Sequence, residues 1–152
     1  NEYAPLGIEA AVTNTATVSG TGITPVTATE TVNAEAAPNL AITKSVSPVP
    51  VTENGTLTYT FRIQNYGSVA ATNTTGVVIT DTFAPVLNNL TAALNGTAWT
   101  AATDYTYNEA TGTFSSTAGA ITVPAATYTQ DSTTGAWVVT PGESTLVITG
   151  TV

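Results

Sequence analysis

The sequence predicts an all-β protein built as an antiparallel β-sandwich. Apolar and polar residues alternate with a period of two over most of the chain, which is the pattern of half-buried strands. Thr, a β-branched residue that suits the half-exposed face of a sheet, makes up 35 of the 152 residues. Short turns separate the alternating segments at regular spacing, and we find no convincing helical pattern.

The clearest strand covers residues 56–65, where apolar residues at 57, 59, 61 and 63 alternate with polar residues. Its two faces therefore differ in polarity, as in a strand that packs on a core with one face. Turns rich in Pro, Asn and Gly divide the chain at 48–50, 53–55, 65–67, 95–96 and 141–142. Between them, further strands are expected at 9–19, 25–33, 39–47, 76–82, 120–130 and 144–152.

A small internal repeat occurs in the second half of the chain. Residues 105–114 and 128–137 both consist of a strand, a polar turn containing Thr-Gly, and a second strand that ends on an aromatic residue. This pattern predicts two hairpins. We expect them to be two similar turns of one sheet.

Composition excludes several classes of function. The chain has two cationic and ten acidic residues, so it offers almost nothing to neutralise nucleic-acid phosphates or anionic lipid. It has no His and no Cys, which excludes zinc sites of the usual kind, Ser-His-Asp triads and thiol catalysis. We therefore expect no enzymatic activity and no cofactor. A surface of Thr with little charge suits an extracellular or cell-surface protein, and no apolar run is long enough to span a membrane.

Residues 39–83 resemble the repeat family called "domain of unknown function 11". That family reads as an Ile-Thr-Lys strand, a Pro turn, a Gly-x-x-Leu-x-Tyr strand, an Asn-x-Gly turn and a strand ending in Asp; the matching residues here are 42–44, Pro48, 55–59, 65–67 and 77–81. The segment that begins at Pro141-Gly142-Glu143 resembles the family's penultimate strand. The resemblance implies an immunoglobulin-like β-sandwich and tandem modules of microbial surface proteins. The stretch at about 86–140 is longer than the family pattern, and we expect it to contain inserted hairpins.

The order of the segments differs from that of the family. The family's Asn-Thr-Ala-Thr-Val strand comes last, whereas here residues 14–18 precede the opening strand. We therefore divide the chain into an N-terminal strand segment, 1–38, and a sandwich body, 39–152. Residues 1–38 could be donated to a neighbouring subunit, could end the preceding module of a longer chain, or could fold back into their own module.

Three polar residues fall on faces that are otherwise apolar. Lys44 alternates with Leu40, Ile42 and Val46 and is expected to point into the core, while Asp81 and Asn14 occupy similar positions on two other strands. A desolvated Lys44 could attack the Asn14 carboxamide and form an isopeptide bond, with Asp81, or alternatively Glu30, as the assisting acid. This set resembles the isopeptide sites of Gram-positive pilins and adhesins. The simpler interpretation is a buried Lys44–Asp81 ion pair, with Asn14 bonded to backbone.

These observations predict a structural subunit of an extracellular fibre, pilus-like filament or surface stalk. Its expected partners are copies of itself or adjacent modules of its own chain, with no nucleic acid and no membrane insertion. The alternative is an adhesin that recognises a glycan or a host protein. An aromatic platform of that kind could come from Trp99, Trp137, Tyr105 and Tyr107, although such residues more often belong to a core.

Overall fold

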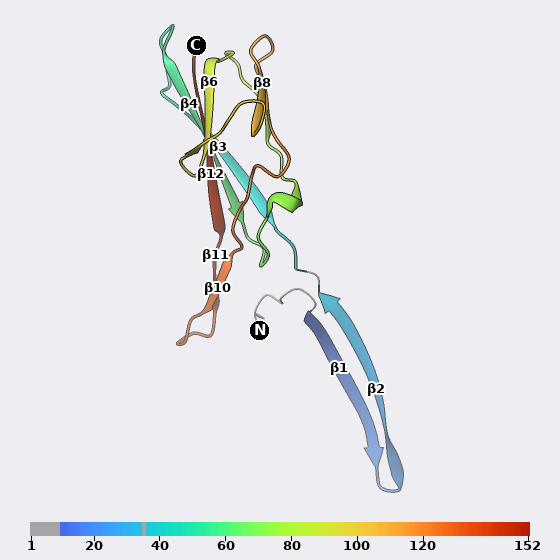
Figure 1. Cartoon of the computed structure of the whole chain (residues 1–152). Helices are drawn as coiled ribbons and strands as arrows, with labels where there is room; N and C mark the ends of the chain where they lie inside the picture. Colours follow the sequence, from blue (N-terminus) through green and yellow to red (C-terminus); the bar gives the residue numbers. More distant parts are fainter. Residues whose placement is uncertain (1–9, 35) are drawn as a thin grey trace.

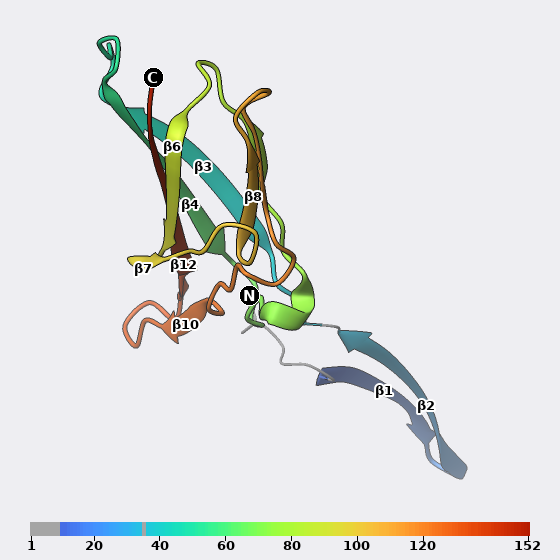
Figure 2. The ribbon, with the colours of Figure 1, turned by 45° about the horizontal axis from the view of Figure 1, so that its top comes forward.

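The computed structural model describes residues 10–34 and 36–152 and is all-β, with no α-helix among them. It has two parts, which Figures 1 and 2 show from two sides: a long hairpin near the N-terminus, and residues 36–152, which we call the body. The hairpin projects away from the body in both views. All pairings between the named strands are antiparallel, as the sequence predicted.

The hairpin consists of β1 (Ala10–Gly20) and β2 (Ile23–Ala34), which form a sheet of their own. Residues directly opposite each other lie on the same face of an antiparallel pair, so the register gives the hairpin two unlike faces. One face consists of cross-strand Thr pairs: Thr13 with Thr31, Thr15 with Thr29, and Thr17 with Thr27. The other face includes Asn14, Ala16, Val18, Val26, Ala28, Glu30 and Val32.

The larger sheet of the body has five strands. Their order is β3 (Leu40–Ser47), β4 (Thr56–Asn65), β12 (Gly142–Thr151), β6 (Asn88–Leu94) and β7 (Thr97–Ala98). β4 and β12 are central, and their alternating burial follows the alternation of the sequence. Asn95 and Gly96 both have positive φ in the tight turn from β6 to β7, a conformation that Asn and Gly tolerate.

The smaller sheet has three strands, in the order β5 (Thr80–Thr82), β9 (Thr113–Ser116) and β8 (Tyr105–Asn108). A separate hairpin is made by β10 (Thr127–Gln130) and β11 (Trp137–Thr140). A single 3-10 turn covers Asn73–Thr75.

Both body sheets contribute to one hydrophobic core. Phe83 lies near its centre, with its ring 4.7 Å from that of Tyr59 on β4 and 6.2 Å from that of Phe114 on β9. The fully buried residues include Leu87, Phe114, Ile121, Leu146 and Ile148. The burial of apolar side chains from both sheets is what holds the body together.

The structure corrects some expected elements. The two predicted hairpins are present, but β8 and β9 lie in the three-stranded sheet and β10 and β11 form a sheet of their own, so they do not share one. Of the expected strand at 120–130 only β10 forms, and residue 123 makes a single bridge with Ala71. β6 and β7 were not expected, because Asn88–Leu94 has no clear alternation of polar and apolar residues.

Candidate functional site

The inner face of β3 is uncovered. Leu40, Ile42, Lys44 and Val46 lie directly opposite Asn65, Ile63, Phe61 and Tyr59 of β4, so both sets share the face that carries the core. The β4 residues are all buried, whereas Ile42 is 53% exposed and Leu40 and Val46 are 37% and 38% exposed. Adjacent strands of one sheet therefore differ in burial because only one of them is covered.

The inner face of β3 is exposed because the three-stranded sheet, which ends at β5, does not extend over it. β5 is its outermost strand and pairs only with β9, so one edge of β5 has no partner strand among the described residues. β3 is likewise the outermost strand of the larger sheet. Between them lies a cavity of about 180 Å³ whose lining residues are all apolar: Leu40, Ala41, Ile42, Ile63, Val77, Val78 and Ile79. We call this cavity, with Lys44, Val46 and Asp81 beside it, the β3–β5 groove.

Lys44 and Asp81 form an ion pair that connects the two strands of the groove. The Lys44 ammonium also lies over three core rings, 4.9 Å from the centre of Tyr59, 5.5 Å from Phe61 and 5.3 Å from Phe83. The second carboxylate oxygen of Asp81 accepts a 2.9 Å hydrogen bond from the backbone N–H of Thr82. Lys44 thus faces the core as expected, but it is not buried: 41% of its side chain and 18% of that of Asp81 are exposed. The expectation of a buried pair was wrong, because no strand within 10–34 or 36–152 covers β3.

The hairpin holds the other two predicted site residues. Asn14 lies directly opposite Glu30, so the amide and the carboxylate are neighbours on the hairpin's less polar face. Both side chains are exposed, and so are the flanking Val18, Val26 and Val32, at 65–67%. The structure therefore brings Lys44 to Asp81 and Asn14 to Glu30, but it does not join the two pairs within one chain.

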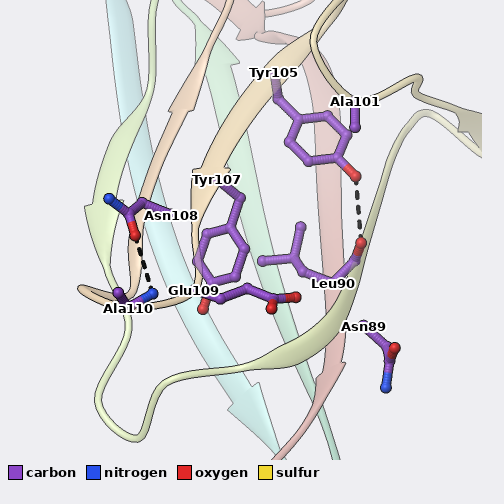
Figure 3. Close-up of a pocket in the computed structure, with 8 residues that line it drawn as sticks. All are labelled: Asn89, Leu90, Ala101, Tyr105, Tyr107, Asn108, Glu109 and Ala110. Atoms are coloured by element: carbon purple, nitrogen blue, oxygen red, sulfur yellow. Dashed lines mark hydrogen bonds between the residues drawn. The ribbon is translucent and has the colours of Figure 1, made fainter.

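Of the four aromatic residues considered for a binding platform, Trp137 is half-buried on β11, and the other three belong to the core or pack against it. Trp99 and Tyr107 pack against the core, and Tyr105 belongs to it. A depression of about 690 Å³ lies beside the two Tyr residues (Figure 3), but their hydroxyls are already bonded. Tyr105 donates to the carbonyl of Leu90 at 3.3 Å, and Tyr107 donates to the carbonyl of Leu87 at 2.9 Å, while burial raises the pKa of Tyr105. These bonds close the body on the side away from the β3–β5 groove.

The turn carboxylates have structural partners. Asp104 accepts a hydrogen bond from the backbone N–H of Thr100, and Asp131 accepts from those of Thr133 and Thr134. No group of acidic residues suited to a metal ion occurs in the part of the chain that the structure describes. None of the helical segments found there could cross a membrane.

Sequence reasoning did not single out Ile42 and Val78 as exposed residues. Alternation shows which face of a strand a residue lies on, but whether that face is covered depends on how many strands the opposite sheet has.

Comparison with protein-family models, curated proteins and solved structures finds no match.

Proposed function

We propose that this protein is a structural subunit of an extracellular fibre or surface stalk, which assembles head to tail by β-strand complementation. The β1–β2 hairpin of one copy fills the β3–β5 groove of the next. One observation carries the proposal: an uncovered apolar strand face in the body coexists with a projecting hairpin whose own apolar side chains are exposed. An isolated two-stranded hairpin is marginally stable in water, so this one gains most by packing on another surface.

The number of strands supports this pairing. The smaller sheet has three strands and the larger has five. A hairpin that adds β1 to the free edge of β5 would extend the smaller sheet by two strands and place it over β3. The product would be an immunoglobulin-like β-sandwich with five strands facing five, in which the free edge of β5 is paired and the inner face of β3 is covered.

The distribution of polarity supports it as well. The groove carries one polar pair, Lys44 and Asp81, among apolar residues. The hairpin face carries one polar pair, Asn14 and Glu30, between Val and Ala residues. Apolar positions can then meet apolar positions while Glu30 and Asn14 approach Lys44, and the Thr face of the hairpin stays in water.

A second copy is favoured over closure within one chain by the attachment of the hairpin. The linker that follows β2 is held to the body: Asn39 donates from its backbone N–H to the Asn65 side chain at 2.9 Å and accepts from the backbone N–H of Tyr66 at 2.8 Å. Gly67 lies so close to the linker that an added Cβ would be 2.1 Å from the carbonyl oxygen of Ala37. From these contacts the hairpin extends away from the body (Figure 1). A head-to-tail contact that does not close into a ring generates filaments.

The test uses two pairs of variants that differ only in the face they alter. Val26→Glu places a charge on the apolar face of the hairpin, and Thr27→Glu places it on the Thr face. Ile42→Glu and Thr43→Glu do the same for the inner and outer faces of β3. Since burying a Val contributes roughly 1.5–3 kcal/mol, the inner-face variants should raise the concentration needed for polymerisation by about tenfold or more.

Polymerisation is followed by sedimentation and electron microscopy of the full chain, with circular dichroism confirming that each variant folds. Filaments from the wild type and both Thr variants, together with monomers from Val26→Glu and Ile42→Glu, support the proposal. Wild-type chains that remain monomeric at millimolar concentration would contradict it, as would filaments that tolerate the inner-face charges. A hairpin cross-linked to its own body would instead show closure within one chain.

A further inference from the structure

We infer that Lys44 of one copy and Asn14 of the next become joined by an amide bond once the hairpin fills the groove. This inference rests on the proposed function, since it requires the hairpin of one copy and the groove of another. It adds a modification site to that interface and assigns a role to each polar residue in it.

The groove already holds the lysine in place. Lys44 Nζ is paired with Asp81 and lies within 5.5 Å of three ring centres, so the amine approaches the groove from a fixed side. Its side chain is 41% exposed, since none of the strands that the structure describes lies over β3. The space beside the amine is therefore the space that the hairpin would occupy.

The hairpin supplies an electrophile, the Asn14 side-chain amide, on its less polar face. Asn14 is an exposed amide on the face that would turn toward the groove, with Ala16 rather than a larger residue beside it on that face. Two positions further on the same strand, Val18 would extend the apolar contact. A β1 docked next to β5 in the register that places Asn14 beside Asp81 would bring its carboxamide to the Lys44 amine.

The docked pair supplies both the nucleophile and the acid of the reaction. A proton passes from the Lys44 ammonium to the Asp81 carboxylate in contact with it, which leaves a neutral amine and a neutral acid. The amine then attacks Cγ of Asn14, while the Asp81 acid donates a hydrogen bond to the amide oxygen. The new Nζ–Cγ bond forms, the Cγ–Nδ2 bond breaks, and Nδ2 leaves as ammonia with the proton that Nζ gives up. No oxidant or other co-reactant is needed, and each bond forms once.

Asp81, and not Glu30, is the assisting acid in this mechanism. Asp81 is bonded to Lys44 before docking, whereas Glu30 reaches the site only with the hairpin. Asp81→Asn should slow cross-linking by about 100-fold or more, within the range typical of losing a general acid–base group. Glu30→Gln should leave the cross-link in place.

The first experiment is the mass of assembled material after boiling in SDS. We expect a covalent ladder from the wild type and from Asn73→Ala, a matched exposed asparagine of the body. Each link should be lighter than its component chains by one ammonia, in a peptide that joins Lys44 to Asn14. Filaments that dissolve into monomers of unaltered mass would overturn this inference but leave the proposed function standing. Absence of filaments would overturn both.

The second experiment mixes two variants, neither of which can cross-link alone. Lys44→Met retains a reactive Asn14, and Asn14→Ala retains a reactive Lys44. Their mixture has one productive combination per pair of chains, so it should give covalent dimers and no longer ladder. A monomer that carries its own Lys44–Asn14 link, or a link from Lys44 to Glu30 with loss of water, would contradict the assignment.

Discussion

At the scale of single residues, the body depends on buried polar groups that are fully bonded. Asn65 is completely buried at the end of β4 and makes four hydrogen bonds. Its side-chain oxygen accepts hydrogen bonds from the backbone N–H groups of Asn39 and Gly67. Its side-chain NH2 donates to the backbone carbonyls of Val69 and Pro124. One side chain thus connects the linker of the hairpin with two loops of the body.

Replacing Asn65 with Ala should destabilise the body strongly. The change leaves two backbone N–H groups and two carbonyls without that partner, and an unsatisfied buried group costs roughly 1–3 kcal/mol. We expect a loss of at least about 3 kcal/mol in the free energy of unfolding, measured by urea denaturation. Gln64→Ala, one residue earlier on the outer face, should cost less than about 1 kcal/mol. Equal effects of the two changes would argue against this role for Asn65.

At the scale of elements, the β10–β11 hairpin is closed by its turn more than by burial. Most of its side chains are exposed. Asp131 accepts 2.8 Å and 2.9 Å hydrogen bonds from the backbone N–H groups of Thr133 and Thr134, and these bonds lower the pKa of Asp131. A carboxylate thereby takes the place of a backbone acceptor in the turn.

This hairpin should open selectively in acid. Because the folded-state pKa of Asp131 lies below its unfolded value, the ionised carboxylate stabilises the turn above the unfolded pKa, and that stability is lost as pH falls through the folded pKa. We expect the amide resonances of Thr133 and Thr134 to shift and their hydrogen exchange to accelerate below about pH 4. Asp131→Asn should abolish the transition. A transition of unchanged size in that variant would assign it to another group.

At the scale of the whole molecule, the described residues combine a body in which the inner face of β3 is exposed with a hairpin whose two strands form a sheet of their own. The edges of β3 and β5 lie on the same side of the body and lack strand partners among the described residues. Free edges of this kind favour association with another chain. The sequence places a single lysine on the inner face of β3 and no charge on the adjacent stretch 76–80, so these segments themselves carry little charge.

Hydrogen exchange should therefore distinguish the edge strands from the central ones. In monomers, amides on the outer edge of β5 and along β1 should exchange quickly, whereas those of β4 and β12 should be protected. In filaments we expect protection of β5 and β1 to rise by about tenfold or more, with little change in β4 and β12. Exchange that is identical in the two states would show that filaments form through another surface.

Local chemistry was enough to predict the strands with the clearest alternation and several of the turns. Alternation over 56–65 predicted β4 and its buried face, and Asn95-Gly96 predicted a tight turn, because both depend on residues close in sequence. The pairing of Lys44 with Asp81 was also predicted, since two opposite charges on otherwise apolar faces are driven together.

The tertiary structure alone decided which faces are covered. Period two assigned Leu40, Ile42, Lys44 and Val46 to one face, yet their exposure follows from the three-stranded width of the opposite sheet. Likewise, the sequence placed Asn14 on an apolar face, but only the strand register showed Glu30 directly opposite it. Strand polarity is a local property of the chain, whereas coverage depends on contacts between segments far apart in sequence.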